Sequence, residues 1–427
     1  MTTDATPALA RGAPVAPEER VVALDALRGF ALLGIALVNI TIMAYGFWNL
    51  VPLHRRFGAW WDQAALAVVG VLVAGKANSL FSFLFGLGFT LQLRRLDERA
   101  GRGVAIYLRR LAVLFAFGLA HALLVWSGDV LHHYAVLGLL LLALRKVPRR
   151  WLFALMAVAF LVPQSVRLSR ALTATPERRA EREAVVLDLQ ARSREAYAGG
   201  SYASAVRMRV VDVRQHDVDR PVDTLDWLTT LGLTALIGLH FGRERLIERA
   251  AERADFWARL QRWSLALGLA SGLLSVAIGR LIPTRGPTPL GVLSGLLFDL
   301  CRPTLMLFYV SAVVRLARRR PGARWLAPVA AAGRMPLTNY VMQSVLGTFV
   351  FYGHGLGLYG EVAPLACYGV AAAIWGVEVA WSRWWQRRFL FGPGEWLWRV
   401  LTYGRRLPIR RPAPAAAAAA GGGADGG

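Results

Sequence analysis

The sequence predicts an all-α fold, a polytopic transmembrane helical bundle of about ten spans with both termini in the cytoplasm. Two compositional values predict the membrane class. Hydrophobic residues make up 56% of the 427 residues, and the mean hydropathy is +0.41. Charged residues make up 18%, whereas soluble domains average roughly 25%. These values exclude a soluble globular domain and a chain disordered over most of its length.

The third observation is a series of apolar runs long enough for transmembrane helices. A bilayer core about 30 Å thick takes roughly 20 residues per helix, and fewer where a bundle shields the helix ends. The predicted spans are residues 30–47, 79–93, 108–126, 130–144, 151–166, 225–241, 263–282, 291–314, 325–352 and 364–381. The apolar run 64–75 is too short to cross, so we expect it to form an interfacial or re-entrant helix.

The basic residues predict the orientation of the bundle. Lys and Arg total 50 and Asp and Glu total 27, which gives a net charge of +23. With a cytoplasmic N-terminus, these spans bring every basic cluster to the cytoplasmic side, as the positive-inside rule requires. The clusters are Arg94, Arg95, Arg99, Arg102, Arg109 and Arg110; Arg145, Lys146, Arg149 and Arg150; Arg243, Arg245 and Arg249; Arg315, Arg318, Arg319, Arg320 and Arg324; and Arg383, Arg387 and Arg388. We therefore expect the lipid bilayer of the inner or plasma membrane, and no nucleic acid, as the partner of this charge.

This topology divides the chain into five segments. We expect a disordered cytoplasmic N-terminus (1–20), an N-terminal transmembrane half (21–166), an extracytoplasmic polar helical loop (167–224), a C-terminal transmembrane half (225–404) and a disordered Pro/Ala/Gly tail (405–427). Long loops translocate largely regardless of charge, so the arginines of the polar loop do not oppose this assignment. Cys301 and Cys367 lie in apolar runs, which predicts no disulfide framework.

The first span carries three polar residues on one stripe. Arg28 and Asn39 differ by about 20° of helical azimuth, and Asp25 lies within about 60° of Arg28. An ionisable residue at bilayer depth costs about 2.5–3.5 kcal/mol, so each one requires a partner or a function. One interpretation is an interfacial Asp25–Arg28 pair with an amide that joins helices, and the other is one wall of a substrate site.

The third predicted span, 108–126, contains a histidine. His121 follows Arg110 by about 16 Å of helix, which predicts a position near the membrane midplane. A neutral imidazole donates one hydrogen bond and accepts another, which suits either a structural role or a general base. His54, in the predicted outer loop after the first span, is either solvated or at the entrance to a site.

The outer turn after this span contains Asp129, His132 and His133 at positions i, i+3 and i+4. That spacing can hold a metal ion. Asp129 is also well placed to cap the helix that starts at Val130, with both imidazoles at the wet interface. We favour the cap and predict no metal site.

Two pairs of polar residues lie in the late spans. Asp299 and Arg302 are three residues apart, so we expect them to form an ion pair with each other. Asn339 and Gln343 are four residues apart and share one helical face.

Arg334 is predicted to lie near mid-membrane, about 15 Å past Arg324, where Pro336 should kink the helix. A guanidinium at that depth requires a carboxylate, a cavity or a ligand, and Glu378 is one available partner. The kink also frees backbone groups that need water or a ligand. The pattern favours a functional role for Arg334.

Several ordered motifs resemble those of the YeiB-like bacterial membrane proteins, a family of unassigned function. They are residues 20–40 (RVVALDALRGFALLGIALVNI), 75–86 (GKANSLFSFLFG), His121 with the turn 126–134 (WSGDVLHHY), 333–344 (GRMPLTNYVMQS) and 391–399 (FGPGEWLWR). The resemblance covers nearly the whole chain apart from its tails and part of 167–223. Pro336 departs from the family, which usually has Ala at that position.

The opening motif is also distantly similar to that of membrane-bound acyltransferases, including the sugar O-acyltransferases and the heparan-glucosaminide N-acetyltransferases. Asp25, Arg28 and Gly29 match both patterns. In the O-acyltransferases the position matching Asn39 is a histidine thought to be catalytic, whereas the N-acetyltransferases have asparagine there. We therefore assign the role of base to His121, with His54 as the second candidate.

These resemblances imply an acyltransferase that moves an acyl group from cytoplasmic acyl-CoA to a small-molecule, glycan or lipid acceptor on the outer side. The arginines of 94–110 would hold the CoA phosphates, and no cofactor is expected to bind tightly. The predicted substrate-binding residues are Asp25, Arg28, Asn39, Asp129, Arg334, Asn339 and Gln343. Two alternatives stay open: a transporter or exporter of a small metabolite, with Arg334 as the counter-ion, and a non-catalytic membrane protein.

Overall fold

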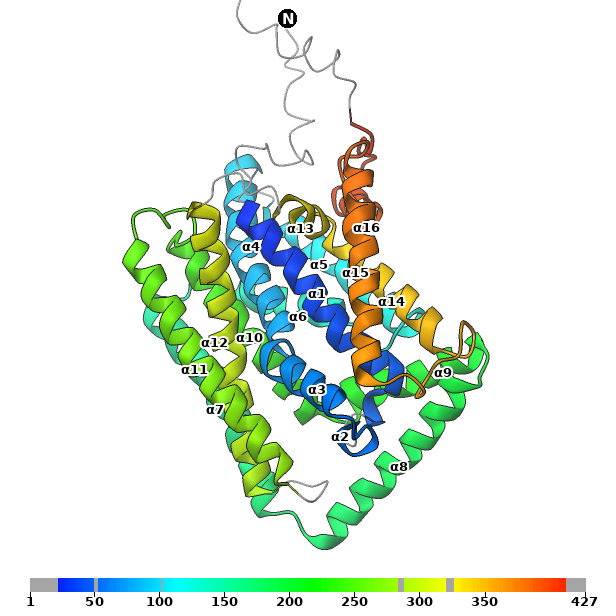
Figure 1. Ribbon diagram of the computed structural model, residues 1–427. Helices are drawn as coiled ribbons and strands as arrows, with labels where there is room; N and C mark the ends of the chain where they lie inside the picture. The colour runs from blue at the N-terminus through cyan, green and yellow to red at the C-terminus, as the bar shows by residue number, and fades with distance from the viewer. Residues whose placement is uncertain (1–21, 50–52, 101–102, 283–287, 320–325, 412–427) are drawn as a thin grey trace, which may run out of the picture.

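The computed structural model describes residues 22–49, 53–100, 103–282, 288–319 and 326–411, and within these ranges the side chains of residues 49, 54, 55, 93–100 and 221 are left out. The described chain is helical (Figure 1), with one isolated antiparallel bridge between Phe389 and Arg410 and no strand ladder in those ranges. The all-α prediction is confirmed. The predicted tails, 1–20 and most of 405–427, lie outside the described residues.

The helices follow one another with short connections. In chain order they are α1 (Val22–Tyr45), η3 (Phe47–Asn49), α2 (Leu53–Arg56), α3 (Trp60–Leu72), α4 (Lys76–Ala100), α5 (Gly103–Leu124), α6 (Leu131–Ala143), η4 (Leu144–Lys146), α7 (Arg149–Leu172), α8 (Pro176–Ala198), α9 (Tyr202–Val213), η5 (Arg214–Val218), α10 (Pro221–Arg243), α11 (Ala254–Arg280), α12 (Pro289–Arg319), α13 (Leu326–Gly333), α14 (Pro336–Phe351), α15 (Pro364–Gln386) and α16 (Pro393–Tyr403).

Eight helical stretches of the described chain are long and apolar enough to cross a membrane, which identifies a membrane protein. They are Val22–Tyr45, Trp60–Gln92, Gly103–Leu124, Arg149–Leu172, Val222–Arg243, Ala254–Arg280, Pro289–Arg319 and Pro364–Gln386. The predicted count of ten is therefore not confirmed. The predicted spans 130–144 and 325–352 form helices of 13, 8 and 16 residues, all shorter than a full span of roughly 20 residues.

The predicted span 325–352 is not one continuous helix. The structure divides it into two helices. α13 ends at Gly333 and α14 begins at Pro336. Proline lacks the amide hydrogen that a continuing helix needs, but it is well accepted in the first turn of a new one. The predicted disturbance at Pro336 is thus a break in the helix rather than a kink.

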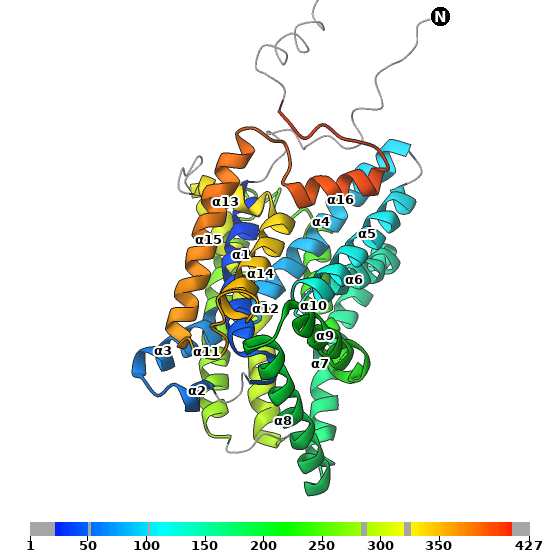
Figure 2. The ribbon, with the colours of Figure 1, turned by 90° about the vertical axis from the view of Figure 1, so that its right-hand side faces the viewer.

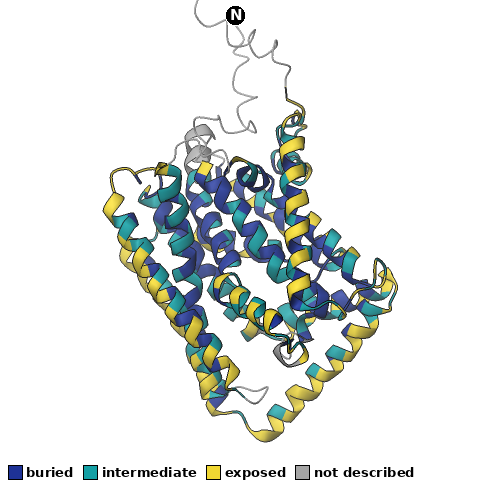
Figure 3. Ribbon diagram, in the orientation of Figure 1, coloured by how far each residue is buried: buried dark blue, intermediate teal, exposed yellow. Residues whose placement is uncertain are grey.

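α1 is the central helix of the bundle. Its apolar window is 61% buried within the chain, and the other candidate spans reach at most 39%. Figure 3 shows it surrounded by other helices, while α11 and α8 carry exposed faces. α13 crosses α1 at close range, because a Cβ at Gly333 would lie 1.8 Å from the carbonyl oxygen of Asp25. The residues just after Gly333 therefore lie at the start of α1.

The apolar run 64–75, predicted to be interfacial or re-entrant, lies mostly in α3. This 13-residue helix is joined to α4 through the turn 73–75, in which Gly75 has a φ of +78°. Together the two helices form the stretch Trp60–Gln92 that is long and apolar enough to cross. The interfacial or re-entrant placement stays a prediction.

The two ends of the bundle differ in their covering helices. α16 lies across the end where α1 begins, and α8 and α9 lie toward the opposite end (Figures 1 and 2). We call these the α16 end and the α8 end. α8 and α9 come from the polar segment 167–224, which the sequence assigns to the outer side.

α14 receives its N-terminal cap from α16. Glu395 accepts hydrogen bonds from the amide nitrogens of Leu337 (2.6 Å) and Thr338 (3.1 Å), and from the hydroxyl of Thr338 (2.6 Å). A carboxylate at a helix N-terminus satisfies amides that have no partner within the helix and complements the helix dipole. The motifs 333–344 and 391–399 therefore meet in one structural contact.

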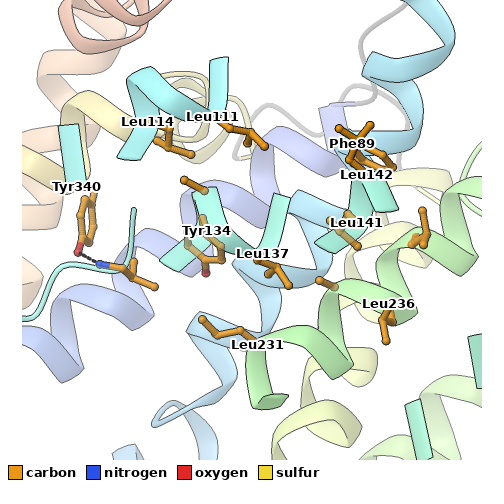
Figure 4. Packing of buried hydrophobic residues seen from close by; sticks show 14 of the residues in the cluster. Phe89, Leu111, Leu114, Tyr134, Leu137, Leu141, Leu142, Leu231, Leu236 and Tyr340 are labelled. Carbon is orange, nitrogen blue, oxygen red and sulfur yellow. Dashed lines mark hydrogen bonds between the residues drawn. The ribbon is translucent and has the colours of Figure 1, made fainter. Parts of the chain in front are cut away.

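α4 and α10 pack at backbone contact. A Cβ at Gly86 would lie 2.0 Å from the carbonyl oxygen of Ala235, and one at Gly238 would lie 2.0 Å from that of Phe83. Leu236 of α10 belongs to the same buried hydrophobic cluster as Leu141 of α6 (Figure 4).

We expect Gly86→Ala to destabilise the protein by about 1–3 kcal/mol, because the added methyl group forces two backbones apart. Gly88→Ala is the matched control, since no heavy atom lies within 4 Å of its Cβ position. The control should keep wild-type stability or gain up to about 1 kcal/mol of helix propensity. Thermal unfolding of the detergent-purified variants measures both, and equal melting temperatures would contradict the close contact.

Candidate functional site

Five ionisable side chains gather at the α8 end of the bundle, and we call them the histidine cluster. They come from the last turn of α5, the α5–α6 turn, the first turn of α6 and η5. The members are His121, Asp129, His132, His133 and Asp217. The three histidines and Asp129 are buried, and the side chain of Asp217 is 23% exposed.

His121 forms a dyad with Asp129. Its Nδ1 atom lies 2.8 Å from Oδ2 of the carboxylate, and both side chains are almost fully buried. An ionised carboxylate only accepts hydrogen bonds, so Nδ1 carries the proton and donates it. The other ring nitrogen, Nε2, is buried and has no hydrogen-bond partner in the structure. The dyad therefore orients an imidazole whose Nε2 is free to accept a proton.

Asp129 also holds the start of α6. Its Oδ1 accepts hydrogen bonds from the amides of Leu131 (2.8 Å) and His132 (3.1 Å), so the predicted helix cap is present. Burial acts to raise the pKa of Asp129, but hydrogen bonds from His121 and His132 outweigh it and the net pKa is lowered. The carboxylate is therefore ionised.

His132 lies between two carboxylates. Its Nδ1 is 2.8 Å from Oδ1 of Asp129, and its Nε2 is 3.2 Å from Oδ2 of Asp217. His133 Nε2 is 3.2 Å from the other oxygen of Asp217. Burial would raise the pKa of Asp217, yet hydrogen bonds from the two histidines lower it. Without a metal ion, two ionised carboxylates require a proton on both nitrogens of His132.

α14 covers one side of the dyad. The rings of His121 and Tyr340 are 5.2 Å apart between centroids. The Tyr340 hydroxyl accepts a hydrogen bond from the amide of Val130 at 3.3 Å, drawn as a dashed line in Figure 4. The broken-helix motif 333–344 thus reaches the histidine cluster through Tyr340.

A second buried carboxylate fixes α9 to this end. Asp212 accepts hydrogen bonds from three neutral donors, the Trp48 indole (3.0 Å), the Ser127 hydroxyl (3.1 Å) and the Tyr197 hydroxyl (2.6 Å). Burial raises the pKa of Asp212, although these hydrogen bonds oppose the change. His216 stacks on Trp48 at 5.0 Å, and burial lowers its pKa. These contacts hold α9 and η5, and hence Asp217, beside η3 and the α5–α6 turn.

The position of His121 differs from the prediction. α5 begins at Gly103 and ends at Leu124, so His121 lies in its last turn rather than halfway along. The prediction counted from Arg110 as the membrane boundary. In the structure, Arg110 lies two turns inside α5 with its guanidinium 3.5 Å from the ring centroid of Trp398. The base candidate is therefore at the α8 end.

Of the other residues predicted in the first half, Asp25 and Arg28 form the expected ion pair at 2.9 Å. Asn39 is half-buried, and its side chain has no hydrogen bond among the described residues. The side chain of His54 lies outside the described residues. The same holds for Arg94, Arg95, Arg99 and Arg102, so a CoA-binding role for that cluster stays a prediction.

Arg334 lies near the start of α1 rather than beside the middle of that helix. Gly333 packs on Asp25 at the start of α1, which brings Arg334 to the α16 end. Its Nε donates to the side-chain oxygen of Gln386 at 2.5 Å, whereas the expected partner Glu378 accepts from Gln343 at 2.8 Å. The prediction was wrong because it continued one straight helix from Arg324 through the break.

The shared face of Asn339 and Gln343 is turned toward α15. Asn339 donates to the Ser382 hydroxyl and to the Ala332 carbonyl, both at 3.0 Å. Both amides are buried and joined to neighbouring helices. Among the described residues, the hydrogen bonds of the Arg334, Asn339 and Gln343 side chains lead to Gln386, Ala332, Ser382, Leu32 and Glu378, and none of these partners belongs to the histidine cluster.

Sequence reasoning did not select Asp217, Asp212 or Tyr340. The two aspartates belong to a segment read as a solvated polar loop, in which carboxylates are common. One available signal was His216 next to Asp217, because His216 is the single histidine of the segment 167–224. Tyr340 lay inside a quoted motif, but a tyrosine on an apolar helix carries no signal of its own.

Comparison with known proteins gives the family. A family model described as "Protein of unknown function (DUF418)" matches residues 241–405. The chain is 32% identical over 411 residues to "Uncharacterized protein YxaH" of Bacillus subtilis (strain 168), which covers 93% of this chain and 98% of that protein. The chain belongs to the YeiB-like DUF418 family. "Uncharacterized protein YeiB" of Escherichia coli (strain K12) is 29% identical over 404 residues, covering 90% and 96%.

Membership of the DUF418 family confirms the resemblance to YeiB-like proteins. The matched region contains α14 and α16, whose contact at Glu395 joins two of the recognised motifs. The chain is also 27% identical over 415 residues to "Uncharacterized 39.9 kDa protein in amylase 3'region" of Bacillus acidopullulyticus, and this match covers 93% of this chain and 97% of that protein. The similarity to acyltransferases stays a prediction.

Proposed function

We propose that this DUF418 protein is a membrane-bound acyltransferase of the inner or plasma membrane that acylates an acceptor on the outer side. The observation that carries the proposal is the His121–Asp129 dyad, in which Nε2 of the imidazole is buried and without a partner. A carboxylate that fixes the proton on Nδ1 leaves Nε2 available as a general base.

In the proposed reaction, His121 Nε2 takes the proton of the acceptor hydroxyl or amine. The acceptor atom then forms a bond to the thioester carbonyl carbon of acyl-CoA, and the carbon–sulfur bond breaks. The protonated imidazole returns its proton to the leaving thiolate, so His121 is unchanged after each cycle. Asp129 stabilises the imidazolium formed between these steps.

The position of the dyad favours an acceptor on the outer side. His121 lies at the α8 end, and the polar helices of 167–224 cover that end. For this reaction the pantetheine arm of acyl-CoA would have to extend through the bundle from the α16 end, so that the thioester carbon reaches His121. A donor of a hydrogen bond to the oxyanion that forms on the thioester carbonyl would stabilise the transition state. Arg334 and Asn339 have other partners at or near the α16 end, so among these predicted substrate-binding residues we propose Asn39 for this role.

The test is acyl transfer in sealed proteoliposomes with radiolabelled acetyl-CoA outside or inside and candidate hydroxyl and amine acceptors in the opposite compartment. We expect label on the acceptor only when protein is present. Flux of an acceptor without acyl-CoA and without covalent change would instead support a transporter. Absence of transfer with short-chain and long-chain acyl-CoA donors would overturn the proposal.

A further inference from the structure

The outer half of the histidine cluster has the donor set of a metal site. One ring nitrogen of His132, one ring nitrogen of His133 and a carboxylate oxygen of Asp217 all lie within 4.8 Å of one another. Two imidazoles and one carboxylate are a usual protein donor set for Zn²⁺ and related ions. The three side chains come from α6 and η5, two segments separated by 85 residues between His132 and Asp217.

The separations fit a tetrahedral ion. Zn²⁺ binds nitrogen and oxygen at about 2.0–2.1 Å, so two ligands of a tetrahedral site lie about 3.3 Å apart. Each imidazole Nε2 is 3.2 Å from an Asp217 oxygen. The two oxygens of the one carboxylate therefore reach both imidazoles.

The surroundings also match a metal site. His132 Nδ1 is 2.8 Å from Asp129, which gives the carboxylate–histidine arrangement that orients metal-binding imidazoles. A bound ion would replace the proton on His132 Nε2, so His132 would no longer carry a charge between two carboxylates. The Asp217 side chain is 23% exposed, so solvent reaches this carboxylate. Water would supply the fourth ligand of a tetrahedral ion.

We propose that His132, His133 and Asp217 bind one divalent transition-metal ion of the zinc class. The ion would fasten η5 to α6 at the α8 end. This differs from the sequence-based prediction of no metal, which considered Asp129 as the third ligand. Asp129 is instead engaged with His121 and the α6 amides. The proposal rests on these contacts and not on acyl transfer.

The test uses the full chain, purified with a tag that contains no histidine and freed of metal with a chelator. Titration with Co²⁺ should give the visible absorption of a tetrahedral site at one equivalent, and Zn²⁺ should displace it. Asp217→Asn and His133→Gln should each weaken Co²⁺ affinity by at least about 100-fold, because one of three protein ligands is lost. His240→Gln, on α10 outside the cluster, is the matched control and should bind as the wild type does.

Zn²⁺ should also raise the melting temperature of the wild type and of His240→Gln but not of Asp217→Asn, because a ligand that binds only the folded state stabilises it. This second measurement separates lost binding from misfolding in the variants. No stoichiometric binding by the wild type, or equal affinity in Asp217→Asn, would overturn the metal site. Metal binding without acyl transfer would overturn only the proposed function. Acyl transfer without metal binding would overturn only the metal site.

Discussion

His121→Gln should reduce acyl transfer by roughly 10²–10⁴-fold, the usual contribution of a positioned general base. Glutamine keeps a polar side chain of similar reach but cannot accept the acceptor's proton. The binding of acyl-CoA should change little, since in the proposed reaction His121 acts on the acceptor. The measurement is the initial rate of label transfer in proteoliposomes, together with the melting temperature of each variant.

His216→Gln is the control for this prediction. His216 is also an imidazole at the α8 end whose Nε2 is buried without a hydrogen-bond partner. It stacks on Trp48 and has no carboxylate on its ring nitrogens comparable to Asp129. We expect this variant to keep its rate within a few-fold of the wild type. Equal losses in both variants would indicate damage to this end of the bundle, and full activity of His121→Gln would remove the assigned role.

The parts of the fold that depend on neighbouring residues could be predicted from the sequence. The Asp25–Arg28 and Asp299–Arg302 ion pairs both form, at 2.9 Å and 3.0 Å, because residues three apart face each other on a helix. The cap by Asp129 is equally local. Helix class and apolar spans follow from composition and run length in the same way.

The parts that depend on distant segments could not be predicted. Asp217 reaches His132 across 85 residues, and no spacing rule connects them. Arg334 was placed too deep because the path of the chain after the break at Pro336 depends on packing of Gly333 against α1. A depth calculated from residue number at a rise of about 1.5 Å per residue is correct only along an unbroken helix perpendicular to the membrane.

The recognised motifs therefore have two kinds of role. The contact of Glu395 with Thr338 joins the motifs 391–399 and 333–344 at the α16 end and explains them as structure. At the α8 end, His121 and Asp129 of the turn motif leave a ring nitrogen without a partner, which structure alone does not require. The second pattern is the one expected of a site that acts on a ligand.

Asp299→Ala should destabilise the protein by about 3–5 kcal/mol, the cost of removing one partner of a buried charge network. Asp299 is 7% exposed and lies 2.5 Å from Arg167, 3.0 Å from Arg302 and 2.7 Å from the Gln164 amide. Alanine would leave two guanidinium groups close together between α7 and α12 with one carboxylate fewer.

Asp188→Ala is the matched control, because Asp188 pairs with Arg192 at 3.5 Å on the exposed face of α8. Exposed pairs of this kind contribute about 0–1 kcal/mol, so its melting temperature should stay near that of the wild type. Chemical and thermal unfolding in detergent measure both variants. Similar small losses of stability in both variants would mean that water hydrates Arg167 and Arg302 when Asp299 is removed. The charge network would then be accessible to solvent rather than buried in the bundle.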